Sequence, residues 1–243
     1  MEILSANRKG SWILVSNIWS NVASVRERAA EAARRSGRPP EAVTIIAVSK
    51  TRPAAEIREV LAAGITHLGE NRVQELKEKW PFFQEGVSWD LIGSLQTNKV
   101  KSALEMAHLI HSVDRESLAD ELARVCELRG RPCSVLVEVN VSGEMSKHGV
   151  SPEGLEPLLR QISRLGNLRV EGLMTMAPLS DNPEDARPHF RRLREWARRM
   201  SELGLPGVEM RHLSMGMSGD YAVAIEEGAT LVRIGTALFG ARQ

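Results

Sequence analysis

The sequence lacks several features that mark large classes of proteins. Its two cysteines, Cys126 and Cys133, have a spacing that matches no zinc or redox motif, and such sparse use of cysteine suits a reducing cytoplasm. Lysine and arginine total 32 against 31 aspartates and glutamates, so the net charge of +1 gives no field that would draw nucleic acid or an acidic membrane. No run of about 18 apolar residues occurs, which excludes a membrane-spanning helix. We therefore expect a cytoplasmic protein that binds neither nucleic acid nor membrane.

The N-terminal segment lacks the long apolar stretch and the small-residue cleavage site of a signal peptide. We interpret residues 1–16 as a poorly specified extension and expect a single folded domain over residues 17–243. This domain should begin with a helix, because Ile18 and Val22 start an apolar pattern of helical spacing that Gly37 and two prolines stop.

From Val43 onward, short β-branched runs alternate with amphipathic segments. Alternation of strands and helices predicts a parallel sheet, and eight such units predict a closed (β/α)8 barrel, the TIM barrel of the α/β class, in one domain. No G-x-G-x-x-G follows the first run, which disfavours the open dinucleotide-binding sheet. The expected strands are residues 43–49, 66–69, 88–93, 108–113, 133–141, 168–176, 209–216 and 230–235.

Polar residues and glycines gather where these strands should end, which is the face that carries chemistry in such a barrel. The segments "SMGMS" and "IGTALFG" follow the seventh and eighth strands, where barrels often hold a phosphate group. Gly216 and Gly235 let backbone N–H groups approach an anion, and Ser214 and Thr236 add hydroxyl donors. The residues alone equally allow both glycines to serve only in ordinary tight turns.

A lysine, Lys50 in "AVSKTRP", ends the first expected strand. In a closed barrel this strand lies beside the eighth, so a ligand whose phosphate is bound there would place a reactive atom near Lys50. A lysine, a phosphate site and a barrel together point to pyridoxal 5′-phosphate (PLP) held as a Schiff base. An aldolase-like phosphosugar enzyme that uses the same lysine remains an alternative on these residues.

Eight motifs occur in order along the chain: "AVSKTRP", "HLGENRVQE", "WDLIGSLQTNK", "HSVDR", "LVEVNVSGEMSKHG", "GLMTMAP", "LSMGMSGD" and "LVRIGTALFGAR". Over about Asn17 to Arg242 the chain closely resembles the pyridoxal phosphate homeostasis proteins, the YggS/PROSC family. The resemblance implies a single-domain barrel with an extra N-terminal helix, similar to the N-terminal barrel of alanine racemase (PLP fold type III). It also implies that PLP forms an internal aldimine on Lys50.

The same resemblance implies a set of cofactor-binding residues. Asn71 would face the ring, and Arg233 would contact the ring nitrogen or the phosphate. An arginine cannot accept a proton, so it would leave that nitrogen unprotonated and weaken the cofactor as an electron sink. The implied PLP site consists of Lys50, Asn71, Ser214, Met215, Gly216, Arg233, Gly235 and Thr236.

The function that the resemblance implies is PLP binding for vitamin B6 and amino-acid homeostasis, without strong catalytic activity. Its partners would be PLP and PLP-dependent apoenzymes, and we expect a monomer. Two-base racemisation needs a second acid–base group, commonly a tyrosine, but the one tyrosine, Tyr221, falls in a helical segment. We also expect no second β domain beyond the barrel. A low-activity PLP-dependent amino-acid racemase is the alternative.

Three further groups of residues have simpler interpretations. Six arginines lie between Arg187 and Arg199, and the apolar stripe among them indicates an outer helix with a solvated face. His108 and His111 lack carboxylate neighbours in the sequence and are expected to pack rather than bind a metal. Lys147 and His148 fall in a loop at the active face, where they could steer a phosphate or a substrate carboxylate.

Overall fold

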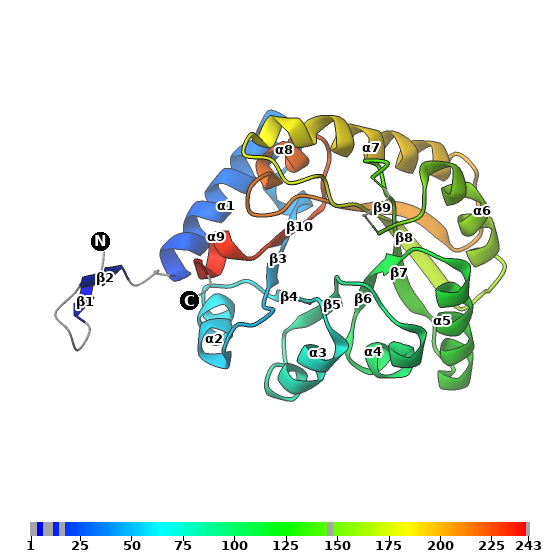
Figure 1. The fold of residues 1–243 in the computed structure, drawn as a ribbon, viewed down its shortest axis with the longest axis horizontal. Coiled ribbons are helices and arrows are strands. Elements are labelled where there is room, and N and C mark those ends of the chain that lie inside the picture. The colour runs from blue at the N-terminus through cyan, green and yellow to red at the C-terminus, as the bar shows by residue number, and fades with distance from the viewer. Residues whose placement is uncertain (1–3, 7–11, 15–17, 145–147, 242–243) are drawn as a thin grey trace.

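Eight parallel strands close into a barrel in the computed structural model, which describes residues 4–6, 12–14, 18–144 and 148–241 (Figure 1). Around the barrel the strands follow the order β10, β3, β4, β5, β6, β7, β8, β9, so the last strand of the chain completes the ring. The predicted barrel is confirmed. The strands are β3 (Thr44–Val48), β4 (His67–Glu70), β5 (Ser88–Leu91), β6 (Leu109–Val113), β7 (Cys133–Glu138), β8 (Leu168–Met174), β9 (Val208–Ser214) and β10 (Leu231–Ile234).

Helices surround the strands in Figure 1, as expected for crossovers between parallel strands. None of the described helices combines the length and the apolarity needed to cross a bilayer. Short 3-10 turns occupy Pro40–Ala42, Trp80–Phe82, Thr97–Lys99 and Pro183–Ala186. The helices after the first are α2 (Ala54–Ala62), α3 (Val73–Lys79), α4 (Val100–Met106), α5 (Glu116–Arg129), α6 (Pro152–Ile162), α7 (Arg187–Ser201), α8 (Tyr221–Glu226) and α9 (Thr236–Phe239).

The extra N-terminal helix, α1 (Ile18–Arg35), packs against α8, α9 and α2. The side-chain amide of Asn21 donates to the carbonyl of Leu238 over 2.9 Å, which joins the start of α1 to α9. Before α1, strands β1 (Leu4–Ala6) and β2 (Trp12–Leu14) pair in antiparallel fashion, and the sequence did not predict them. The apolar face that α1 buries consists of Ile18, Val22, Val25, Ala29, Ala32 and Ala33.

Side chains along each strand alternate between the barrel interior and the surrounding helices, which gives two apolar layers. The larger outer layer fills the space between strands and helices. The interior holds a smaller inner cluster, whose burial contributes about 1.5–3 kcal/mol for each large aliphatic side chain. The inner cluster consists of Ile46, Leu109, Leu136, Met174 and Leu231.

The barrel interior changes from apolar to polar toward the C-terminal ends of the strands. Two residues beyond a member of the inner cluster, β6, β7 and β10 carry His111, Glu138 and Arg233, respectively, and all three are buried. The inner cluster is therefore an apolar floor beneath a layer of titratable groups.

The arginine-rich helix α7 lies on the outside of the barrel, as its apolar stripe predicted. Its buried residues include Phe190, and Arg187, Arg191 and Arg194 contact the carboxylate of Glu227 at 3.1, 3.2 and 3.1 Å. These arginines therefore attach α7 to the end of α8.

Two of the phenylalanines, Phe190 and Phe82, provide a test of the packing. Phe190 is completely buried, whereas Phe82 is 70% exposed. We expect Phe190→Ala to lower the free energy of unfolding by about 3–5 kcal/mol, because it leaves a cavity in the outer layer. The matched control Phe82→Ala should change it by less than about 0.5 kcal/mol. Urea denaturation measures both values, and equal losses would contradict this account of the core.

Candidate functional site

The turn that carries Lys50 follows directly on β3. The N–H of Ser49 donates to the carbonyl of Gly69 over 3.0 Å, so the ladder between β3 and β4 continues one residue beyond Val48. Lys50 lies two residues beyond the end of β3, at the C-terminal rim of the barrel. Its side chain is half-buried. The structure therefore presents this lysine at the mouth of the barrel.

Strand β10 brings the last glycine turn to the same place. Ile234 of β10 pairs with Ala47 of β3, so the next two residues, Gly235 and Val48, are neighbours. A Cβ added at Gly235 would lie 3.7 Å from the Cβ of Val48, an ordinary contact distance. Because Val48 precedes Lys50 by two positions, the lysine and the turn after β10 lie close together.

Gly216 and Gly235 are glycines for different reasons. Gly216 has a φ of +94°, a conformation that favours glycine. A Cβ there would also lie 2.6 Å from the Cβ of Ala224, so the close packing against α8 is by itself enough to require glycine. Gly235 has neither a positive φ nor a steric obstacle. The tight-turn interpretation therefore accounts for Gly216, whereas neither φ nor packing within the protein requires glycine at position 235.

A hydroxyl that the sequence predictions omitted, that of Ser218, joins the two glycine turns. Its Oγ accepts the N–H groups of Gly235 and Ala237, each at 3.2 Å. Backbone donors of this kind are the groups that bind an anion in a glycine turn. Ser218 lies within "SMGMS", so its place in the motif was an available signal, but its contact with the next turn depends on the fold.

The structure places the remaining predicted residues in different positions. Asn71 follows β4, and its backbone lies close to that of Gly93, two residues after β5. A Cβ on Gly93 would collide with the carbonyl oxygen of Asn71. Thr236 begins α9 and is exposed. The side chain of Met215 is completely buried in the outer layer, and its N–H donates to the carbonyl of Leu231 over 3.1 Å. The structure thus does not bring the Met215 side chain to the barrel mouth.

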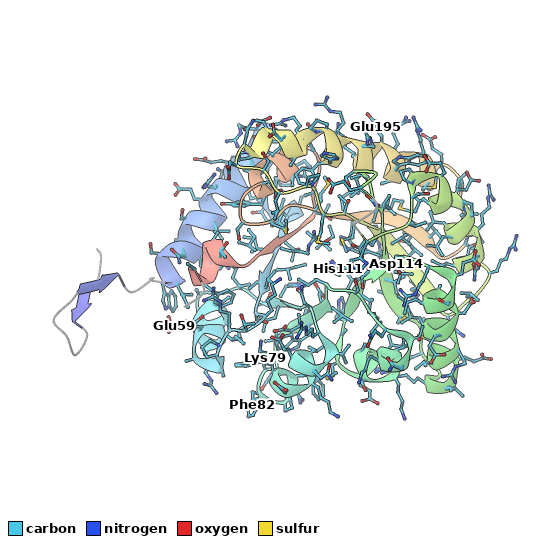
Figure 2. All side chains as sticks on the ribbon, viewed as in Figure 1. Glu59, Lys79, Phe82, His111, Asp114 and Glu195 are labelled. Carbon is cyan, nitrogen blue, oxygen red and sulfur yellow. The ribbon has the colours of Figure 1, made fainter. Side chains whose placement is uncertain are left out.

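Arg233 is the centre of a buried polar network below the mouth. Its Nη1 donates to Ser214 Oγ over 2.5 Å, and its Nη2 donates to the carbonyl of Thr175 over 2.8 Å. Ser214 Oγ lies 2.9 Å from Nδ1 of His111, whose Nε2 is 3.5 Å from Oδ2 of Asp90 (His111 is labelled in Figure 2). The carboxylate of Asp90 favours a proton on Nε2, and the Ser214 hydroxyl can accept from the guanidinium while it donates its own proton to Nδ1.

Burial controls the charges of this network. It lowers the pKa of Arg233 to about 10, so the guanidinium remains charged at neutral pH. Burial also lowers the pKa of His111, which keeps the imidazole neutral there. In the opposite sense, burial raises the pKa of Glu138 to about 7, with a further upward contribution from Asp114 and a downward one from Arg233. The interior therefore holds a permanent cation near a carboxyl group that titrates close to neutrality.

Other residues singled out in the sequence lie away from this network. Tyr221 is almost fully buried in the outer layer, and the guanidinium carbon of Arg28 lies 5.6 Å from its ring centroid. His148 is exposed, and Lys147 lies outside the described residues. Within the described part of the chain, no group of three or more His, Cys, Asp or Glu side chains could hold a metal ion.

Comparisons with known proteins agree with this architecture. A family model described as the N-terminal domain of alanine racemase matches residues 20–243. The pyridoxal phosphate homeostasis protein of Aquifex aeolicus is 46% identical over 228 residues, which cover 93% of this chain and 99% of that protein. The protein of the same name from Pseudomonas aeruginosa is 44% identical over 229 residues, which cover 94% and 97%. This chain belongs to the pyridoxal phosphate homeostasis protein family.

Solved structures relate this homeostasis protein family to the racemase barrel. PipY of Synechococcus elongatus, solved with PLP bound, is 38% identical, has a TM-score of 0.81, and is matched over 92% of this chain and 100% of its own. Alanine racemase from Streptomyces coelicolor has a TM-score of 0.67 at 19% identity, over 91% of this chain and 59% of the racemase. The second likeness shows the fold alone. Both the family resemblance and the racemase-like fold are confirmed.

The carboxyl group of Glu138 predicts a pH-dependent stability. Because its folded-state pKa of about 7 exceeds the ordinary value of 4.5, its charge is disfavoured in the fold, and the free energy of unfolding should fall as the pH rises from about 4.5 to about 7 and level off above that. Glu138→Gln should remove this loss and raise the free energy of unfolding at pH 8 by up to about 3 kcal/mol relative to the unaltered protein. Urea denaturation at pH 5 and pH 8 measures the effect. The exposed control Glu85→Gln should lose as much stability between pH 5 and pH 8 as the unaltered protein. An equal loss in Glu138→Gln would show that Glu138 does not cause the pH dependence.

Proposed function

We propose that this protein binds PLP at the barrel mouth, holds it through an imine bond to Lys50, and serves PLP and amino-acid homeostasis. The observation that carries the proposal is the pairing of β10 with β3, which sets the Gly235 turn beside the residues that lead to Lys50. PipY with PLP bound and the names of the relatives support the choice of ligand. PLP would supply an aldehyde at this place, and the amine of Lys50 would hold it by condensation to a C=N bond with release of water.

The residues at the mouth suit the aldehyde and phosphate ends of this cofactor. Lys50 offers the amine. The N–H groups of Gly235 and Ala237 donate to Ser218 Oγ in this structure, so they would become two backbone donors for the phosphate once a phosphate oxygen displaces that hydroxyl. The hydroxyl of Thr236, exposed at the start of α9, would add a third donor.

Arg233 would define the electronic character of the ring end. Its guanidinium, fixed by Ser214, cannot accept a proton, so a ring nitrogen beside it stays unprotonated and draws electrons weakly. A weak electron sink stabilises a substrate carbanion less well. Asn71 would face the ring and Gly216 would contribute through its backbone, whereas Met215, whose N–H donates to the carbonyl of Leu231, would only hold that turn in place.

The position of Tyr221 supports a carrier or regulator rather than a racemase. A two-base racemase needs an acid–base group opposite the lysine, but the one tyrosine of the chain is buried in the outer layer. The relatives bear the name of homeostasis proteins rather than of an enzyme. A low-activity racemase remains the second candidate because the barrel is shared with alanine racemases.

We also propose PLP-requiring apoenzymes as recipients of the cofactor, a monomeric state and a cytoplasmic location. The barrel closes within one chain, so no second copy is needed to complete the sheet. Cys126 and Cys133 are both free thiols, which suits a reducing compartment.

Lys50→Ala tests the attachment directly. The unaltered protein mixed with PLP should show the visible absorbance of a Schiff base, and borohydride should fix PLP on Lys50. In Lys50→Ala both signals should disappear, because Lys50 supplies the amine that follows β3 beside the Gly235 turn. The control Lys101→Ala, an exposed lysine on α4, should behave like the unaltered protein. Undiminished absorbance in Lys50→Ala would refute the attachment.

The choice between carrier and racemase has its own test. The purified protein, loaded with PLP, is incubated with L-alanine in D2O, and the D-isomer and the α-deuterium content are measured. We expect no enrichment above free PLP at the same concentration. Enrichment that depends on Lys50 would favour the racemase instead.

A further inference from the structure

The backbone immediately after Lys50 is strained. Thr51 has a φ of +62°, and among the residues that the structure describes it is the one non-glycine residue with a positive φ. This left-handed conformation is unfavourable for a β-branched residue and persists only where the surroundings impose it. Whatever holds Thr51 therefore also determines where the lysine side chain begins.

Three side chains hold this turn from the helix side of the sheet. Oε2 of Glu75 accepts the N–H of Thr51 at 2.8 Å. Nζ of Lys79 donates to the carbonyl of Ser49 over 2.7 Å, and Oε1 of Glu70 accepts from the Ser49 hydroxyl at 2.7 Å. The backbone on both sides of the reactive lysine is thus fixed by residues of β4 and α3.

These three side chains, Glu70, Glu75 and Lys79, also bind one another, and we call them the turn clamp. Nζ of Lys79 (labelled in Figure 2) lies 2.6 Å from Oε1 of Glu70 and 3.5 Å from Oε2 of Glu75. The Glu70 side chain is completely buried, and that of Lys79 is 15% exposed. Loss of Glu70 or Lys79 would leave a buried charge without its partner, whereas loss of Glu75 leaves that pair intact and removes the acceptor for Thr51.

We propose that the turn clamp is a positioning device that holds residues 49–51 so that the Lys50 amine meets an aldehyde whose phosphate sits at the Gly235 turn. This inference rests on the proposed function. The clamp touches no part of the ligand and acts through the backbone of Ser49 and Thr51. The phosphate site belongs to other strands, so a relaxed turn would move the amine relative to it, and small misplacements of a reacting group are costly.

The clamp also keeps a second amine out of the reaction. Nζ of Lys79 has three acceptors within range, the carbonyl of Ser49 and the carboxylates of Glu70 and Glu75. An ammonium group with its three N–H bonds so engaged has no lone pair to attack an aldehyde. Lys79 is thereby removed as a competitor of Lys50.

Glu75→Ala tests the clamp at a partly exposed position on α3. Loss of the acceptor for Thr51 should weaken PLP binding about tenfold and slow the appearance of Schiff-base absorbance. The matched control Glu78→Ala removes an exposed glutamate from the same helix and should bind PLP within about twofold of the unaltered protein. A merely structural role would lower the thermal unfolding midpoint and leave PLP affinity, measured far below that midpoint, unchanged.

The Thr51→Gly background provides a rescue. Glycine adopts a positive φ without steric strain, so the turn no longer needs to be held. In this background Glu75→Ala should weaken PLP binding by less than about twofold. A tenfold loss in both backgrounds would show that Glu75 acts by another route, which would overturn the proposal.

Borohydride trapping followed by peptide mapping separates this inference from the proposed function. We expect the adduct on Lys50 in the unaltered protein and in Glu75→Ala, formed more slowly in the variant. No adduct on Lys50 in the unaltered protein would refute the cofactor proposal itself. An adduct that forms with equal rate and affinity in both proteins would refute the turn clamp and leave the cofactor proposal standing.

Discussion

The parallel pairing of β10 with β3 is the contact on which the rest of this structure depends. It joins the last strand of the chain to the first strand of the barrel, and in doing so it removes both open edges of the sheet. In an open sheet the Gly235 turn and Lys50 would lie at opposite edges. Closure makes them neighbours, so a basic amine and a set of backbone donors share one opening. The entropy cost of this long-range contact grows only slowly with the length of the intervening chain.

The barrel interior divides stability and function between two levels. The inner cluster supplies an apolar floor, and the level above it holds buried charge that would be unfavourable without partners. Arg233 satisfies this requirement through Ser214 and the carbonyl of Thr175, while Glu138 responds to the same environment by a raised pKa. A barrel of this kind is shared with racemases, so function resides in the side chains at its mouth rather than in the fold.

Most elements could be predicted from the sequence because their patterns are local. The apolar spacing of α1 and the strand–helix alternation after Val43 follow from periodicity, and the glycine turns follow from motifs. The side chains around the site could be predicted less completely. Met215 adjoins Ser214 in the sequence but faces the opposite side of β9, because alternate residues of a strand point in opposite directions. Ser218 and Glu70 were overlooked because their partners come from other elements.

By itself the sequence determined the order of the strands and helices and the family to which the chain belongs, and it singled out Lys50 as the lysine that we propose holds the cofactor. Only the tertiary structure decided which groups surround that lysine: the Gly235 turn on one side, and the turn clamp on the other. The reason is physical. Periodicity and turn chemistry act within a few residues, whereas the hydrogen bonds that hold residues 49–51 and Arg233 join elements that meet only when the barrel closes.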